Sequence, residues 1–328
     1  MTLGRRMQVG SPPSRQRGVA LLTAILLVAL GTMLATGIAY QNAMTARRGT
    51  ATFAFDQSLG IAEAAEALAA YALAQDAKEN AATDYPAENW AKPFGPVEVT
   101  PGVALEAKLD DASGRFNLNS LVDANGVVDA NSVAEFKHLL RLLELEEKWA
   151  SLLADWIDRD HEPYGFEGAE DSLYSSQMPA YRTLDRPISS ISELLALPGF
   201  GRDRYLKLSP YVVALPQDAK LNICSASGLV LDAMTATDAN KAGRQEYGGT
   251  ESVLEKSRQS ACFPGKDVFL STLSEGDKQI VTGRIDEKSR YFRLTSIVTV
   301  GNTQFALYSL LYRNQGQVRP IMRSFSSD

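Results

Sequence analysis

The chain has 328 residues, of which 45% are hydrophobic and 22% are charged, as in ordinary globular proteins. This length and composition predict a folded protein of two domains and exclude intrinsic disorder as the default state. All charges before residue 19 are positive (Arg5, Arg6, Arg15 and Arg17), so the remainder holds 29 Lys and Arg against 39 Asp and Glu. An acidic remainder with a net charge of −10 disfavours nonspecific attraction to nucleic acid phosphates and anionic lipid headgroups.

The first predicted element is an apolar segment. Val19–Ala46 contains 28 consecutive uncharged residues, and Val19–Tyr40 is long enough to cross a bilayer core as a helix. The arginines before it predict a cytoplasmic amino terminus and place the rest of the chain outside the cytoplasm. A secretory signal peptide is the competing interpretation, but the run is longer than the apolar region of such a peptide and no small-x-small cleavage site ends it.

The helix is expected to continue past the membrane. Phe53–Glu79 is rich in Ala, Leu and Glu, and no proline follows until Pro86. We therefore predict one continuous helix of about 60 residues that begins in the membrane and emerges as an amphipathic stalk. In domain terms, 1–18 is a leader and 19–80 is the transmembrane and stalk helix.

The residues around the start of this helix resemble a known processing site. Arg17-Gly18, followed by Val19-Ala20-Leu21-Leu22-Thr23, resembles the site at which type IV pilins and type II secretion pseudopilins are cut. The resemblance implies that a prepilin peptidase cuts after Gly18 and methylates Val19. Most family members carry glutamate at the fifth mature position, whereas this chain carries Thr23. An uncharged fifth residue is typical of the K minor pseudopilin. A plain signal anchor is the alternative.

The soluble part begins and ends with predicted strands. After a predicted loop, Asn80–Pro101, the alternating segment Val103–Asp110 and the short Arg115–Leu118 favour strands. Two further strands at the far end, Tyr291–Val300 and Thr303–Tyr312, are joined by a Gly-Asn turn, and a shorter one is expected at Ile280–Asp286. These patterns predict an α+β fold with one antiparallel sheet, formed by 81–120 and 280–315 and interrupted by an insertion at 121–279.

The predicted insertion is helical. Its expected helices are Val133–Leu145, Lys148–Arg159, Ile191–Leu197, Asp203–Leu208 and Gly228–Met234. An internal repeat is also visible. Phe116–Ser120 and Leu221–Ala226 each place Asn and Ser directly before a helix-forming stretch, where side-chain oxygens can satisfy free backbone donors. Two unrelated helix caps would give the same pattern.

The resemblance extends over the body of the chain. The segments GRFNLN, LADWIDRD, GAED, SISELLALPGFGRDRY, ALP and LNICSA occur in the order found in the K subunit of type II secretion, from Gly18 to about Tyr312. The second copy usually reads N-x-N-T-A, and here Cys224 and Ser225 replace its second Asn and its Thr. The resemblance implies a pilin-like domain with a helical insert of two SAM-like units, divided near 215–225.

The implied function is structural. The K subunit is a minor pseudopilin that helps start pseudopilus assembly with the I and J minor pseudopilins, ends at the tip, and supports export of folded proteins across the outer membrane. The implied location is the bacterial inner membrane, with one membrane pass and a periplasmic body. The alternative function is a tip subunit of a type IV pilus or DNA-uptake pilus.

An acidic segment is the first candidate site. Seven carboxylates lie within 17 residues: Asp155, Asp158, Asp160, Glu162, Glu167, Glu170 and Asp171. Like charges this close repel unless a cation lies among them, and carboxylates separated by Gly-bearing loops suit calcium. The spacing is not that of an EF-hand, and a solvated acidic loop is the alternative. Because the K family binds calcium in its helical insert, the resemblance implies Asp158, Asp160, Glu170 and Asp171 as ligands. Asp155 is expected to face its own helix instead.

An enzyme is not expected. A glycosidase or aspartic protease needs two carboxylates across a cleft, which acids on one loop do not provide. The sequence has no Gly-x-Ser-x-Gly elbow, Walker loop or zinc motif.

The segment Leu197–Arg202 (LPGFGR) is the second candidate site. It resembles a helix–hairpin–helix turn, whose backbone amides can hold a DNA phosphate. Arg202, Arg204 and Lys207 supply local positive charge, but Asp203 and the acidic body favour a structural turn.

The two cysteines, Cys224 and Cys262, lie 38 positions apart. Both histidines (His138 and His161) lie in another region, so a zinc site with these cysteines is not indicated. In the cytosol they would be unpaired core thiols. On the oxidising side of the membrane we expect a disulfide.

Overall fold

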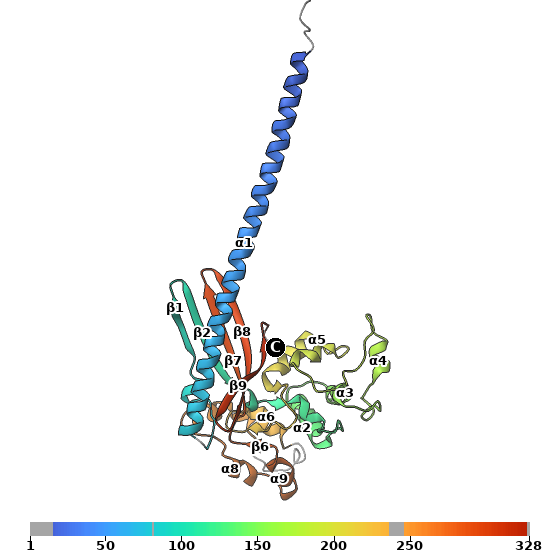
Figure 1. Cartoon of the computed structure of the whole chain (residues 1–328). Coiled ribbons are helices and arrows are strands. Elements are labelled where there is room, and N and C mark those ends of the chain that lie inside the picture. Colours follow the sequence, from blue (N-terminus) through green and yellow to red (C-terminus); the bar gives the residue numbers. More distant parts are fainter. Residues whose placement is uncertain (1–15, 81, 236–245, 327–328) are drawn as a thin grey trace, which may run out of the picture. The chain divides into compact units, whose positions relative to one another are not determined.

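The computed structural model describes residues 16–80, 82–235 and 246–326. Most of the predicted leader, residues 1–15, lies outside the described residues. The chain divides into two compact units, Met1–Gln57 and Ser58–Asp328. One helix, α1 (Gln16–Glu79), runs through the boundary between them (Figure 1). The predicted continuous helix is therefore confirmed.

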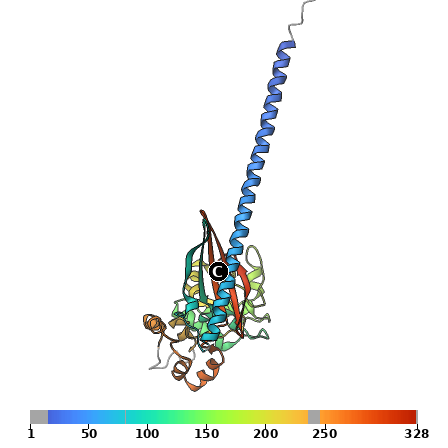
Figure 2. The same ribbon diagram turned by 60° about the vertical axis from the view of Figure 1, so that its left-hand side comes forward.

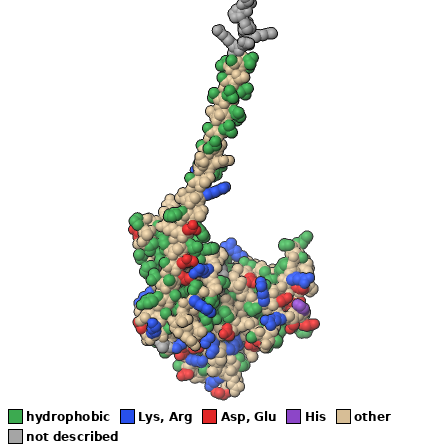
Figure 3. All heavy atoms as spheres, in the orientation of Figure 1, with side chains coloured by type: hydrophobic (Ala, Val, Ile, Leu, Met, Phe, Trp, Pro, Cys, Tyr) green, Lys and Arg blue, Asp and Glu red, His purple; other side chains and the backbone are tan. Residues whose placement is uncertain are grey.

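In the first unit the apolar side chains of α1 are exposed. Large side chains from Val19 to Tyr40 are mostly more than half accessible, and none of the most apolar stretch is buried. Figure 3 shows apolar side chains, in green, along the visible face of this part of α1. By length and composition the helix can cross a membrane, and a membrane would cover these side chains.

The second unit is built on an antiparallel sheet. Its strands are β1 (Phe94–Thr100), β2 (Val103–Asp111), β7 (Tyr291–Val300), β8 (Thr303–Asn314) and β9 (Gln317–Ser324), in the spatial order β1-β2-β7-β8-β9. Each strand pairs antiparallel with its neighbours. Since β2 and β7 are adjacent in the sheet but far apart in sequence, the sheet is interrupted by an insertion, as predicted.

The last turns of α1 cover this sheet (Figure 2). Ala62, Ala65 and Ala69 are buried together with apolar side chains of β2, β7 and β8, and Leu73 extends the contact. Burial of this apolar surface stabilises the packing of helix on sheet. One charged side chain is buried there too: Glu66 accepts hydrogen bonds from Ser309 Oγ and Arg323 Nη2, each at 2.7 Å.

Three strand predictions were wrong in detail. Strand β1 lies inside the predicted loop Asn80–Pro101. It pairs only with β2, so Pro96, which lacks an amide hydrogen, is tolerated on this sheet edge. The predicted sheet ended at 315, but β9 extends it to Ser324. In Ile280–Asp286 only Ile285–Asp286 is a strand (β6), because α9 (Glu275–Thr282) occupies the preceding residues.

The segment between β2 and β7 is mainly helical. Its α-helices are α2 (Ala130–Leu142), α3 (Lys148–Ile157), α4 (Asp171–Ser175), α5 (Gly201–Leu208), α6 (Gly228–Ala233), α7 (Glu251–Ser257), α8 (Lys266–Ser271) and α9. Five 3-10 helices lie in its described part: η2 (Ala112–Gly114), η3 (Leu118–Leu121), η4 (Ile191–Ala196), η5 (Ser209–Tyr211) and η7 (Gly248–Thr250). A single hydrophobic cluster, which includes Phe136, Leu153 and Phe269, runs through these elements.

The internal repeat appears as two similar structural units. β3 (Phe116–Asn117) pairs in parallel with β4 (Val212–Val213), and β5 (Leu221–Asn222) pairs in parallel with β6. The buried Asn117 and Asn222 each accept a hydrogen bond from the backbone amide two residues later. This is the local role that the sequence predicted for them.

The two repeats differ two residues after these asparagines, at Asn119 and Cys224. Asn119 bonds three backbone groups: it donates to the carbonyls of Ile188 and Leu215 and accepts from the amide of Ile188. The corresponding Cys224 is joined to Cys262 by a disulfide. One repeat is therefore tied to a distant segment by hydrogen bonds, and the other by a covalent bond.

Candidate functional site

The acidic segment follows the end of α3. Asp155 lies in the last turn of α3, and Asp158 directly follows its last residue, Ile157. A loop then returns the chain to Glu170, which precedes α4. With three residues between them, Asp155 and Asp158 project from the same side of the helix end.

Three carboxylates of this segment converge. Asp155, Asp158 and Glu170 each offer an oxygen within 4.8 Å of the others, and their exposed fractions are 0%, 1% and 6%. Asp155 Oδ2, Asp158 Oδ1 and both oxygens of Glu170 have no hydrogen-bond donor among the described residues. Buried anionic oxygens without donors are costly, so the cluster requires a positive partner or protons.

The pKa values of these three carboxyl groups reflect the cost of burying their negative charges. Burial raises the pKa of Asp155 to about 6, that of Asp158 to about 7 and that of Glu170 to about 8. Repulsion among the neighbouring carboxylates adds to the shift in each case.

The loop closes tightly over Asp155. The backbone amide of Tyr164 donates to Asp155 Oδ1 at 2.9 Å. A Cβ at Gly168 would lie 2.3 Å from Asp155 Oδ2 and 2.6 Å from the Tyr164 nitrogen, so only glycine fits there. The glycine-bearing loop thus packs directly against the Asp155 carboxylate.

The structure brings together two of the four predicted ligands, Asp158 and Glu170. Asp160 is exposed and lies outside the converging group, because its Oδ1 accepts the amide of Glu162. Asp171 also lies outside, since its Oδ1 accepts both the amide and the hydroxyl of Thr183 at 3.1 Å. These bonds hold the pKa of Asp171 below its usual range.

Asp155 joins the group instead of facing its helix, which corrects the prediction. The i, i+3 spacing of Asp155 and Asp158 was the sequence signal for this arrangement. Asp185 was also missed. Its backbone amide bonds to the carbonyl of Trp156, and this contact between distant segments has no local sequence signal.

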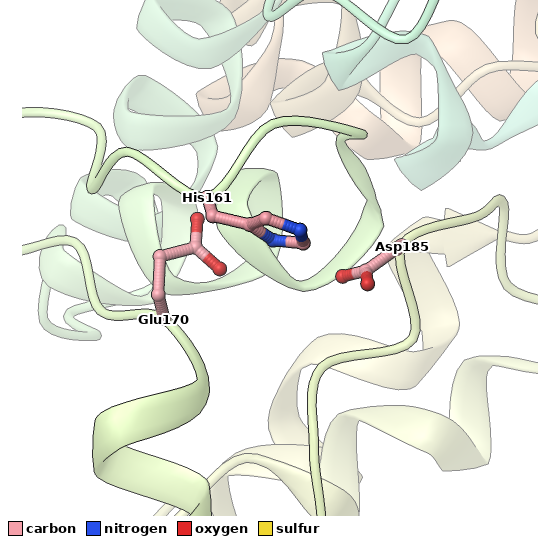
Figure 4. A group of neighbouring side chains, drawn as sticks. All are labelled: His161, Glu170 and Asp185. Carbon is pink, nitrogen blue, oxygen red and sulfur yellow. The ribbon is translucent and has the colours of Figure 1, made fainter.

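A second group of donor atoms shares Glu170. His161, Glu170 and Asp185 each offer one atom within 4.8 Å of the others. In Figure 4 the ring of His161 lies between the two carboxylates. Together the two groups form an extended cluster that can hold hard cations through oxygen ligands.

The remaining candidate residues lie elsewhere. Gly18 and Val19 are both within α1, near its start. The Thr23 hydroxyl donates to the carbonyls of Val19 and Ala20, so it is satisfied within its own helix.

Two basic side chains at the helix–hairpin–helix turn pair with glutamates of the segment between α2 and α3. Arg204 Nε donates to Glu146 Oε2 at 2.7 Å, and Lys207 pairs with Glu144 at 3.3 Å. The Arg204 guanidinium also stacks over Trp149. These partners neutralise two of the three basic side chains that the DNA hypothesis required.

Comparisons with known proteins point to the same family along the chain. A family model described as "Type II secretion system (T2SS), protein K" matches residues 114–217. Type II secretion system protein K of Pseudomonas aeruginosa is 35% identical over 94% of this chain and 92% of the relative. The protein of the same name from Pectobacterium carotovorum subsp. carotovorum is 29% identical over 95% and 97%.

A solved structure is similar to most of the chain. It is described as the GspK-GspI-GspJ complex from the enterotoxigenic Escherichia coli type 2 secretion system. The matching chain is 25% identical, and the match has a TM-score of 0.73 and covers 86% of this chain and all of the other. The α+β fold is thus shared.

Proposed function

Because the chain belongs to the type II secretion system protein K family and is therefore a minor pseudopilin, we propose that it forms the tip of the pseudopilus. In this position it helps to initiate pseudopilus assembly for export of folded proteins across the outer membrane. The observation that carries the proposal is the similarity to protein K relatives along 94% of the chain, helix and insert included.

The start of α1 supports the tip position. A neighbour's charged amino terminus is normally matched by glutamate at the fifth mature position, and Thr23 offers no such charge. Its hydroxyl is already bonded to carbonyls of its own helix. A subunit with nothing above it does not need that charge.

We place the chain in the inner membrane with its body in the periplasm. The exposed apolar part of α1 supports an anchor, and the arginines before it support a cytoplasmic amino terminus. A prepilin peptidase then cuts after Gly18. The partners are the I and J minor pseudopilins, as in the described complex of the similar structure.

We also propose that calcium is held by Asp155, Asp158 and Glu170. The donor set consists of carboxylate oxygens, which calcium prefers, and four of these oxygens are buried and meet no donor from residues 16–80, 82–235 and 246–326. Bound calcium would supply positive charge that offsets their mutual repulsion. With calcium bound, these three carboxylates would fix the loop between α3 and α4, so the role of the calcium site would be structural.

The alternative of a DNA-uptake subunit is not favoured, because Arg204 and Lys207 are paired with glutamates.

Deletion of the gene decides between the two functions. In the deletion strain, folded substrates of type II secretion should accumulate in the periplasm, and expression of the full chain should restore their export. Normal secretion together with lost DNA uptake would favour the alternative.

A further inference from the structure

A group of carboxylates lies where the end of α1 meets the sheet. Asp76 is in the last turn of α1, and Asp84 and Glu88 follow in the segment before β1. Each of the three offers an oxygen within 4.8 Å of the others. Asp84 and Glu88 are buried, and the side chain of Asp76 is 13% exposed. Three negative charges this close and this far from water repel one another when all are ionised.

The charge of this group is only partly compensated. Arg313 of β8 donates from Nη1 to Asp76 Oδ2 at 3.3 Å and from Nη2 to Asp84 Oδ2. Its Nη2 also donates to the carbonyl of Ser289 at 2.9 Å, which holds the guanidinium in place. One positive charge thus faces three carboxylates, and repulsion among the carboxylates remains.

One oxygen of the group lacks a donor. Asp84 Oδ2 accepts from Arg313, whereas Asp84 Oδ1 is buried and meets no donor from the residues that the structure describes. Two donors nearby are directed elsewhere, because Asn80 Nδ2 and Trp90 Nε1 both donate to Glu88. A buried oxygen of this kind needs a partner, and a proton on a neighbouring carboxyl group would provide one.

Glu88 is not the group that carries this proton. Its Oε1 accepts from Asn80, and its Oε2 accepts from Trp90 Nε1 at 2.6 Å and from the Tyr85 amide at 3.3 Å. Burial raises the pKa of Glu88, but these donors oppose the rise because they stabilise the ionised form.

Asp76 is better placed to hold the proton. Burial raises its pKa to about 7, repulsion from Glu88 and Asp84 adds to the rise, and Arg313 opposes it. A hydrogen bond to Asp84 raises the pKa further, because only the protonated form of Asp76 can donate it. The position in the last turn of α1 acts in the same direction, since the helix dipole disfavours a negative charge there.

Solvent reaches the edge of this group. A cavity of about 310 Å³ lies beside it, with Ala77 and Asn80 in its wall. The charged side chains that line the cavity are Asp84, Asp286, Lys288, Arg290 and Arg313. Protons can therefore exchange with solvent while the chain stays folded.

We propose that Asp76 and Asp84 share one proton in the folded protein, and that this proton is a pH-sensitive switch that holds the end of α1 on the sheet. The folded pKa of about 7 lies above the unfolded value near 4. The contribution of the proton to stability is therefore fully present below about pH 4 and is lost as pH rises through about 7. Above that pH, two adjacent carboxylates repel and the contact loosens.

Hydrogen exchange of the purified full chain in detergent, read by mass spectrometry, tests the switch at about pH 6 and about pH 8. Calcium is present throughout, so that the acidic loop after α3 does not enter the comparison. After correction for intrinsic exchange rates, amides in the last turn of α1 and at 84–88 should lose protection by roughly tenfold at the higher pH, since only about a tenth of the pair stays protonated one unit above its pKa.

The change Asp76→Asn separates this proposal from a simple ion pair. The Asn amide is a permanent donor to Asp84, so protection should be equal at both pH values and match the parent at the lower one. If Asp76 is instead ionised and paired with Arg313, the same change removes an ion pair and lowers protection at both pH values.

Glu79→Gln is the matched control, because it removes an exposed carboxylate from the same turn of α1. It should leave the pH dependence of the parent unchanged. Parent protection that is equal at the two pH values would overturn the switch. So would pH dependence that persists in Asp76→Asn, or an Asp76→Asn chain that is less protected at both pH values or fails to fold.

Discussion

At the scale of single residues, Glu170 has the largest role in the acidic cluster. It is buried, neither of its oxygens meets a donor in the described part of the chain, and its carboxylate lies in both donor groups. Its pKa, about 8 in the absence of a cation, is raised by burial first and then by the neighbouring carboxylates. A bound cation would therefore favour the ionised form of this carboxylate.

This charge state predicts a pH-dependent effect of calcium. In chelator, Asp158 and Glu170 bind protons in the folded state up to pH values of about 7 and about 8, above their unfolded pKa values near 4. The folded state then binds more protons than the unfolded state, so stability should fall as pH rises from about 4 to about 8. With calcium present this loss should largely disappear.

Thermal melts of the full chain in calcium and in chelator measure the difference. At about a hundredfold excess over its dissociation constant, calcium should add about 2.7 kcal/mol, or roughly 5–10 °C in Tm. Asp158→Asn should remove most of this shift, while Asp171→Asn, whose carboxylate is turned to Thr183, should retain it. Identical melting temperatures in calcium and chelator for the parent would rule out the calcium site.

A second prediction at this scale concerns the processing site. The precursor should be cut between Gly18 and Val19, because the apolar helix begins there and glycine leaves the scissile bond free of a side chain. Mass spectrometry of the protein from the membrane should find methylated Val19 at the amino terminus. A mature chain that starts at Met1, or beyond Tyr40, is incompatible with pilin-type processing.

At the scale of elements, long periodic segments could be predicted and tertiary pairings could not. α1, β2, β7 and β8 follow from uninterrupted apolar or alternating patterns. β1 was missed because its residues read as a proline-rich loop and it is a strand only by pairing with β2. In the acidic site, Asp158 and Glu170 were predictable from carboxylate density. Asp185 was not, because a backbone bond between distant segments places it.

The disulfide gives a prediction at this scale. Cys224 and Cys262 lie 38 positions apart, so reduction should destabilise the second unit by roughly 3–4 kcal/mol in the chain-entropy model. Denaturant unfolding with and without reductant measures this loss. Cys262→Ala should show the lower stability in both conditions, which separates the disulfide from other effects of reductant. Quantitative alkylation of both thiols in the native, unreduced protein would show that they are not joined in the cell.

At the scale of the whole molecule, features of both the membrane helix and the body fit a subunit that caps a filament. An apolar helix without a charge at Thr23 suits the first position of a filament, and the helical insert adds a large domain to the pilin-like sheet. The body is acidic, and two of the three basic groups at its hairpin turn, Arg204 and Lys207, are paired with glutamates. These features fit a protein that caps an assembly rather than one that binds nucleic acid.

We expect this chain to cap a pseudopilus by joining the I and J minor pseudopilins. Native mass spectrometry of the three mature proteins, co-expressed and purified from membranes in detergent, tests it most directly. We expect a complex that contains one copy of each protein. A chain that stays alone while I and J associate with each other would show that it does not join them at the tip.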